Sequence, residues 1–183
     1  CGSNDSWLAF QDHIFKDHRL HITIVSKAGN EKKDFSLDLT GLYQAKNVVT
    51  VLAIIDVLKR KGWKIFNENI HAGLNNVKKL TGLHGRWEQV NHKPDVFIDV
   101  AHNEDGIRQL VAQAEWMDFH ELHIVMGMVK DKDIERVLQL LPKEANYYFT
   151  KAQIPRAMPE DELAARALQH YLHGHHYPNI KIA

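Results

Sequence analysis

The chain has 183 residues, of which 44% are hydrophobic and 25% charged, so its composition predicts a globular protein with a sizeable core. No run of about 18 apolar residues occurs, which argues against a helix that spans a membrane. Lys plus Arg equals Asp plus Glu at 23 each, so there is no basic excess for nucleic acid or a lipid surface.

The first residues carry the single cysteine of the sequence, Cys1. One cysteine allows no internal disulfide, and no charged-then-apolar secretory segment precedes the fold, so we expect a reducing, cytoplasmic setting. Residues 1–4 lack a starting methionine, and we therefore expect the chain to be part of a longer protein.

A hairpin and two helices are predicted for the first half of the chain. Residues 20–26 and 34–39 alternate apolar and polar, with a Gly29-Asn30 turn signal between them. Residues 43–61 form a helix whose apolar residues are too continuous for a half-exposed helix, so it should be largely buried.

Glycines end both predicted helices. Gly62 supplies a left-handed stop to the first. Asn67 is expected to cap a second helix that continues, with apolar residues at three-to-four spacing, until Gly82.

Strands and helices alternate from Arg86 onward, which predicts an α/β fold with a doubly wound, mostly parallel sheet covered on both faces. We expect strands at residues 96–100, 122–126, 147–150 and 180–182 and helices at residues 104–116, 134–141 and 159–172. The predicted boundary divides the chain into residues 1–83 and 84–183.

Polar side chains follow the first of these strands. Asp99, His102 and Asn103 come where the apolar run 96–100 ends and a helix begins. Because the start of a helix favours anions, this position suits phosphate or a metal-bound phosphate. The alternative is that Asn103 is simply an N-cap.

Five motifs, in this order, resemble elements of the folate-adding branch of the Mur ligase superfamily, the folylpolyglutamate and dihydrofolate synthases. They are residues 41–47 (GLYQAKN), 85–88 (GRWE), 99–103 (DVAHN), 127–133 (GMVKDKD) and 155–157 (PRA). Tyr43, His84 and Glu104 depart from the usual pattern, but none of them replaces a catalytic-type group. The resemblance covers roughly residues 37–168.

The resemblance implies an amide ligase that uses ATP and Mg²⁺ to add L-glutamate to folate or dihydropteroate through an acyl phosphate. Residues 1–83 would be the end of the central ATPase domain, and residues 84–183 a Rossmann-like C-terminal domain that the end of the chain cuts short. No Gly-x-x-x-x-Gly-Lys-[Ser/Thr] loop occurs in the sequence, so the isolated chain should show little turnover, and most metal ligands are expected upstream.

The resemblance also implies roles for particular residues. Arg86 would hold phosphate oxygens, because a guanidinium is a planar, permanently charged donor. Asp99 would contact the ribose or orient Arg86, and His102 would lie near the phosphates. Gln44 and Asn47 would face the adenine, since an amide both donates and accepts.

A second set of residues is assigned to the cleft that receives glutamate or the folate tail. It consists of Lys130, Asp131, Lys132, Asp133 and Arg156. Asp131 or Asp133 is also an ordinary N-cap, and a charge run is usually a solvated face.

A group of histidines, 170, 173, 175 and 176, ends the last helix, and His170 and His173 should share a helical face. We interpret them as solvent-exposed imidazoles at a helix end rather than as a metal site, and expect no metal ligand here. The partners are expected to be small molecules, with no nucleic acid or membrane, and the protein a monomer.

Two rival functions make different claims. A Mur-type ligase acting on cell-wall precursors would differ only in its substrate, whereas a non-enzymatic signalling domain would use Asp99 as a phosphoacceptor and give Arg86 no role. Fold alone does not separate them.

Overall fold

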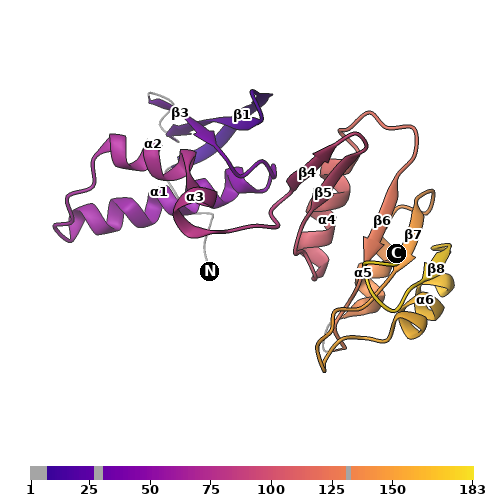
Figure 1. Ribbon diagram of the computed structural model, residues 1–183. Coiled ribbons are helices and arrows are strands. Elements are labelled where there is room, and N and C mark those ends of the chain that lie inside the picture. The colour runs from indigo at the N-terminus through magenta and orange to yellow at the C-terminus, as the bar shows by residue number, and fades with distance from the viewer. Residues whose placement is uncertain (1–7, 27–30, 131–132) are drawn as a thin grey trace. The chain divides into compact units, whose positions relative to one another are not determined.

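The computed structural model describes residues 8–26, 31–130 and 133–183, which divide into two compact units (Figure 1). The first unit is Cys1–Val100 and the second is Ala101–Ala183. No helix in the described ranges is both long enough and apolar enough to cross a bilayer.

An antiparallel sheet opens the first unit, with the order β1-β2-β3. Its strands are β1 (Leu8–Lys16), β2 (Arg19–Ser26) and β3 (Lys32–Leu37). The predicted hairpin is confirmed as β2 and β3, while its turn signal at residues 29–30 lies outside the described residues. Strand β1 was not predicted.

Helix α1 (Gln44–Arg60) packs against this sheet. One stripe of the helix, including Ala45, Val48 and Leu52, joins a buried cluster with the sheet residues Leu20, Ile22, Ile24, Phe35 and Leu37. Gly62 ends the turn that follows with φ of +93°, as predicted.

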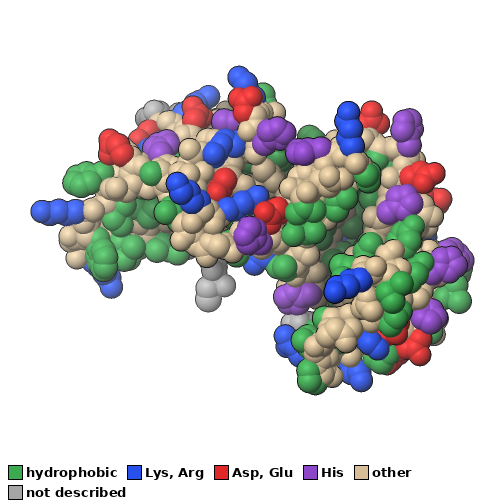
Figure 2. Space-filling model, in the orientation of Figure 1, with side chains coloured by type: hydrophobic (Ala, Val, Ile, Leu, Met, Phe, Trp, Pro, Cys, Tyr) green, Lys and Arg blue, Asp and Glu red, His purple; other side chains and the backbone are tan. Residues whose placement is uncertain are grey.

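The expectation that α1 is largely buried is wrong. Val51, Ile54 and Val57 are 37%, 54% and 43% exposed, because only one face of α1 meets the sheet. Figure 2 shows apolar surface over this part of the first unit.

The helix predicted after Asn67 is two short helices, α2 (Asn67–Asn75) and α3 (Val77–Thr81). The prediction that Asn67 is the N-cap is also wrong. Phe66 takes that position, and its backbone N–H donates to the Asn69 side chain at 3.1 Å. Gly82 ends α3 in the left-handed conformation, as expected.

A two-stranded antiparallel sheet follows, formed by β4 (Glu88–His92) and β5 (Asp95–Ile98). The strand predicted at residues 96–100 therefore exists in shortened form, but among the described residues its pairing partner is β4 rather than a parallel neighbour. It belongs to the first unit.

The second unit confirms the α/β prediction, with a parallel sheet in the order β6-β7-β8. Its elements are α4 (Glu104–Ala114), β6 (His123–Met126), α5 (Ile134–Leu140), β7 (Asn146–Phe149), α6 (Glu160–Gln169) and β8 (Gly174–His176). The prediction of a strand at residues 180–182 is wrong, because these residues form a turn. The third strand of the parallel sheet is β8.

The core of this unit lies against Tyr147 and Phe149 of β7, both 1% exposed. Residues from α4, α5 and α6 all join this one cluster, whereas Val125 of β6, which points to the opposite face of the sheet, is 47% exposed. We expected helices on both faces of the sheet, but in the described part of this unit they pack against one face.

The histidines near the end of α6 do not share a helical face, contrary to the prediction. His170 is the C-cap of α6, His173 follows the helix, and His175 and His176 belong to β8. His170 instead contacts Glu135 of α5, with 2.6 Å between Nε2 and Oε2.

Candidate functional site

The segment from His84 to Glu88 turns sharply and is tied to the end of β5. Gly85 has φ of +68°, and its carbonyl accepts a hydrogen bond from the Val100 N–H at 3.1 Å. Trp87 has φ of +50°, an uncommon conformation for a residue with a side chain, and its backbone N–H donates to Asp99 Oδ2 at 2.7 Å. The Asp99 carboxylate therefore organises this turn.

Tyr43, just before α1, provides a second donor to the same carboxylate oxygen. Its hydroxyl donates to Asp99 Oδ2 at 2.8 Å. Burial and then the hydrogen bond to Asp99 raise the pKa of Tyr43 well above its usual range, while the positive charge of Arg86 lowers that pKa by less. The hydroxyl thus keeps its proton at neutral pH and remains a donor.

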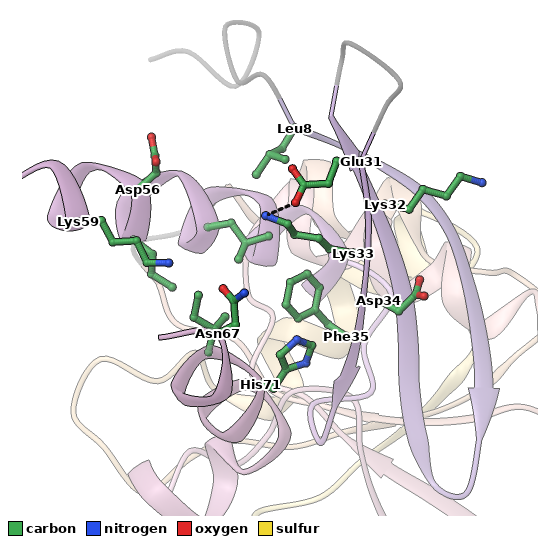
Figure 3. A pocket seen from close by; sticks show the side chains of 13 residues that line it. Leu8, Glu31, Lys32, Lys33, Asp34, Phe35, Asp56, Lys59, Asn67 and His71 are labelled. Carbon is green, nitrogen blue, oxygen red and sulfur yellow. Dashed lines mark ion pairs between the residues drawn. The ribbon is translucent and has the colours of Figure 1, made fainter. Parts of the chain in front are cut away.

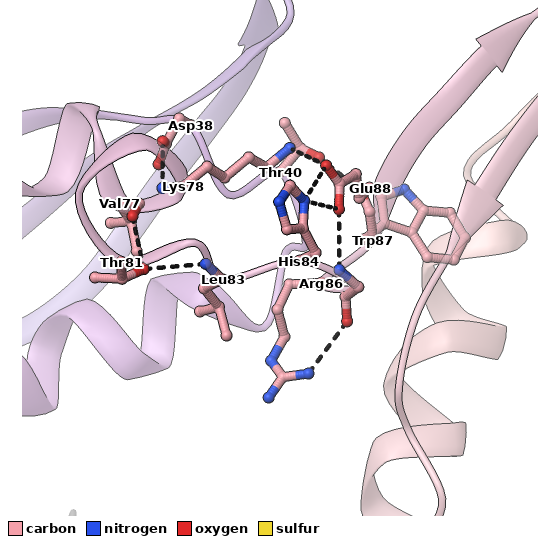
Figure 4. Close-up of polar contacts among 11 residues, drawn as sticks. Asp38, Thr40, Val77, Lys78, Thr81, Leu83, His84, Arg86, Trp87 and Glu88 are labelled. Carbon is pink, nitrogen blue, oxygen red and sulfur yellow. Dashed lines mark hydrogen bonds and ion pairs between the residues drawn. The ribbon is translucent and has the colours of Figure 1, made fainter.

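Glu88 is the centre of a polar cluster on the same turn (Figure 4). Its carboxylate accepts from the Gly85 N–H at 2.9 Å, contacts His84 Nδ1 at 3.1 Å and pairs with Lys78 at 3.5 Å. The Gly85 N–H, His84 and Lys78 together hold the pKa of Glu88 below its usual range. Thr40 adds a further tie by donating to the Trp87 carbonyl at 2.8 Å.

Arg86 projects from this anchored turn. Its Nη1 donates to the Gly85 carbonyl at 3.1 Å, and Figure 4 shows the guanidinium pointing away from Glu88. Because the residues on both sides are held by hydrogen bonds, the base of the Arg86 side chain has a defined position.

The two amides predicted to face adenine lie together on the first turn of α1. Asn47 Nδ2 donates to Gln44 Oε1 at 2.8 Å. Gln44 is 7% exposed, whereas Asn47 is exposed. Of these two side chains, Asn47 is the more accessible to a ligand.

His102 and Asn103 open the second unit. Asn103 is an N-cap of α4, as the alternative interpretation held, and its side chain accepts from the Gly106 N–H at 2.9 Å. His102 is exposed and directly precedes this cap. Gln44, Asn47, Arg86 and Asp99 thus belong to the first unit and His102 to the second.

The structure brings together two of the residues assigned to the substrate cleft. Val129 and Ala157 form an antiparallel bridge, and the Lys130 N–H donates to the Arg156 carbonyl at 3.0 Å. Lys130 and Arg156 are therefore directly opposite each other across this short ladder.

Asp133 has a local role, since it caps α5 by accepting from the Arg136 N–H at 3.4 Å. Asp131 and Lys132 lie outside the described residues. Among the described residues, no group of three or more His, Cys, Asp or Glu side chains could hold a metal ion.

A separate hollow of about 410 Å³ lies between β3, α1 and α2 (Figure 3). Phe35 and His71 stack in it with ring centroids 5.0 Å apart, and Lys33 pairs with Glu31 at 3.1 Å. None of the predicted site residues lines this hollow.

The sequence interpretation missed the contribution of Tyr43, Trp87 and Glu88. All three lie within the motifs at residues 41–47 and 85–88, so their positions were marked but their roles were not. The contacts of the Tyr43 hydroxyl and the Trp87 backbone N–H with Asp99 gave no sequence signal, because Asp99 is 56 and 12 positions away.

Comparisons with known proteins identify the family of the chain. The family model "Mur ligase, glutamate ligase domain" matches residues 85–183. A dihydrofolate synthase/folylpolyglutamate synthase of Mycobacterium tuberculosis is 31% identical over 173 residues, which cover 89% of this chain and 35% of the relative. A probable bifunctional folylpolyglutamate synthase/dihydropteroate synthase of Haloferax volcanii is 31% identical over 74% of this chain and 15% of its own length.

A solved structure extends the similarity to nearly the whole chain. Mycobacterium tuberculosis folylpolyglutamate synthase, complexed with ADP and AMPPCP, aligns with a TM-score of 0.80 and 26% identity over 97% of this chain and 40% of that chain. The chain thus spans well under half of the length of these relatives. Because the family model matches more than half of the residues, the chain belongs to the Mur ligase family and carries its glutamate ligase domain at residues 85–183.

Proposed function

We propose that the protein carrying this chain is an ATP-dependent ligase that joins L-glutamate to folate or dihydropteroate through an acyl phosphate. The observation that carries the proposal is the similarity of 97% of the chain to a synthase complexed with ADP and AMPPCP. In this proposal, residues 1–83 are the end of a central ATPase domain and residues 84–183 are the C-terminal domain. A phosphate-binding loop would come from the rest of the protein.

Arg86 is proposed to bind the phosphates of ATP. Phosphoryl transfer depends mainly on positioning and on neutralising spread negative charge, which suits a guanidinium. The hydrogen bonds of Gly85, Trp87 and Glu88 hold the turn from which Arg86 extends. The backbone of Arg86 therefore has a fixed position from which its side chain can reach the phosphates.

Asp99 and His102 are proposed to complete the nucleotide contacts from the two ends of residues 99–102. Asp99 would accept from ribose hydroxyls or orient Arg86, and His102 would lie near the phosphates. The exposure of His102 beside the N-terminus of α4 supports this assignment, because that end of a helix attracts anions.

Asn47 is proposed to contact the adenine directly, with Gln44 as its support. The exposed amide of Asn47 is oriented by its hydrogen bond to the buried Gln44. An oriented amide offers a donor and an acceptor to a base edge.

Lys130 and Arg156 are proposed to bind a carboxylate of glutamate or of the folate tail. The backbone hydrogen bond between the two residues brings two cationic residues to neighbouring positions, and both kinds of side chain bind carboxylates through charge-assisted hydrogen bonds. Asp133 has a capping role in the structure, and its assignment to this cleft, like that of Asp131 and Lys132, stays a prediction.

We keep the expectation that the metal ligands come mainly from the rest of the protein. The Mg²⁺ that ATP chemistry requires would be held by the rest of the protein. We further propose that the protein is a monomer. We place it in the cytoplasm, where ATP, glutamate and reduced folates are available.

The test is ATP-dependent incorporation of labelled glutamate by the full-length protein, with dihydropteroate and with a reduced folate as acceptors. Arg86→Ala should abolish turnover, whereas Arg60→Ala, which removes an exposed helix pair with Asp56, should leave it unchanged. The 183-residue chain alone should show little turnover. Transfer to a muramoyl precursor instead of either pterin would favour the cell-wall rival, and no transfer to any acceptor would refute the ligase.

A further inference from the structure

A long-range hydrogen bond connects the start of α1 to the end of β5. Asp99 Oδ2 accepts from the Tyr43 hydroxyl at 2.8 Å and from the Trp87 N–H at 2.7 Å, and Tyr43 and Asp99 are 56 positions apart in sequence. Two donors on one oxygen fix the plane of the carboxylate. They therefore also fix the direction in which its other oxygen, Oδ1, points.

The neighbours of Tyr43 are the residues that we assign to the nucleotide. Gln44 and Asn47 follow it on α1, and their side chains are hydrogen-bonded to each other. Arg86 is close enough for its charge to lower the pKa of the Tyr43 hydroxyl. Tyr43 thus directly precedes the proposed adenine contacts on α1 and is hydrogen-bonded to Asp99, the proposed ribose contact.

We propose that Tyr43 is a positioning residue, whose hydroxyl orients the Asp99 carboxylate and sets its spacing from the amides on α1. This inference rests on the proposed nucleotide site. It assigns Tyr43 no contact with the reacting atoms. Its effect on ATP passes through Asp99.

Packing of the Tyr43 ring is the competing explanation. A Cβ at Gly41 would lie 2.6 Å from the Tyr43 ring, so the ring occupies space that only glycine leaves at residue 41. In this explanation, the ring alone holds the turn in place. Phenylalanine at residue 43 separates the two explanations, because it keeps the ring and removes the donor.

The experiment uses the full-length enzyme with Tyr43→Phe, Asp99→Asn and the double variant. Tyr148→Phe is the matched control, since it removes a hydroxyl that is also hydrogen-bonded, to His123 Nδ1 at 3.0 Å in the second unit. Loss of one hydrogen bond to a charged group should raise KM for ATP about tenfold. We expect kcat to change less than about twofold, KM for glutamate to stay unchanged, and the control to match wild type.

The double variant provides the decisive comparison. If Tyr43 acts through Asp99, adding Tyr43→Phe to Asp99→Asn should change KM for ATP by less than about twofold. An unchanged KM for ATP in the single Tyr43→Phe variant would overturn the inference. So would a further tenfold rise in KM for ATP when Tyr43→Phe is added to Asp99→Asn.

A second readout does not depend on activity. The same cycle, measured by urea unfolding of the full-length protein, should be non-additive because Tyr43→Phe removes the donor of the shared hydrogen bond and Asp99→Asn removes the charge of its acceptor. Additive losses would overturn the inference. A coupled cycle in a protein that forms no glutamyl product would refute the proposed function while keeping Tyr43 as the residue that positions Asp99.

Discussion

Replacing Gly85 with alanine tests whether the backbone of residues 84–88 is fixed by close packing. A Cβ at Gly85 would lie 2.8 Å from Val100 Cγ1 and 3.8 Å from the Val100 nitrogen. Gly82 provides a matched control, because it has the same φ of +68° but nothing lies within 4 Å of its added Cβ. The two substitutions therefore share the backbone strain and differ in the contact.

The expected magnitudes follow from these two effects. The left-handed conformation costs a residue with a Cβ roughly 1–2 kcal/mol, and this applies to both variants. Extra atoms in occupied space cost about 1–3 kcal/mol more, which applies to Gly85→Ala alone. Val100 is 53% exposed, so its side chain can move partly into solvent. We therefore expect Gly85→Ala to lose about 1–2 kcal/mol more unfolding free energy than Gly82→Ala, which is the lower part of the 1–3 kcal/mol range.

Urea unfolding measures both losses, provided that the m-value stays unchanged. Gly85→Ala should also raise KM for ATP in the full-length enzyme, because it shifts the turn that bears Arg86, whereas Gly82→Ala should not. Equal losses of unfolding free energy in the two variants would show that the contact with Val100 does not contribute to stability. Close packing would then not be what fixes the backbone of residues 84–88.

Three further results are expected. Leu163→Ala, at a side chain with 0% exposure, should lower the unfolding free energy by about 2–5 kcal/mol, whereas Leu168→Ala, at 59% exposure, should change it by about 0.5 kcal/mol or less in urea unfolding. The pKa of Glu88 in the folded chain lies below its ordinary 4.5, so its stabilising effect is complete above that value and is lost as pH falls through the folded pKa. The urea midpoint of wild type should therefore fall more steeply below about pH 4.5 than that of Glu88→Gln, and parallel curves would contradict the assignment. Arg156→Ala should raise KM for glutamate and leave KM for ATP unchanged in steady-state assays; the reverse pattern would remove Arg156 from the glutamate cleft.

Elements with a strong apolar period were predictable from the sequence. The hairpin β2–β3, helix α1 and the parallel strands β6 and β7 all have such a period, and glycines or polar caps mark several of their ends. Strand β1 was missed because a register shift between Phe10 and Asp12 interrupts its alternation. Strand β8 has no apolar period, since Gly174–His176 is exposed and is defined only by pairing with β7.

Apolar residues misled the sequence interpretation where burial depends on distant parts of the fold. The apolar residues of α1 predicted burial all round, yet the described residues cover one face only. Residues 180–182 alternate like a strand but form a turn.

The candidate site was predictable as a set of motifs but not as a geometry. Arg86 and Asp99 were found from their motifs, and the structure places both at one turn. The turn of Arg86 is joined to Asp99 by the Trp87 backbone N–H, and the Tyr43 hydroxyl donates to the same carboxylate; neither contact has a pattern in sequence. Lys130 and Arg156 were assigned to one cleft, and only the ladder shows them to be opposite each other.

The stacking of Trp87 on Phe97, with ring centroids 5.0 Å apart, gives this region an optical reporter of its own. The indole is half-buried, whereas Trp63 and Trp116 are 65% and 74% exposed and should emit at longer wavelengths. Exchanging the other tryptophans for phenylalanine would leave a single emitter one residue from Arg86. Its emission maximum and quenching by iodide would then follow, in real time, any rearrangement of the turn when nucleotide is added.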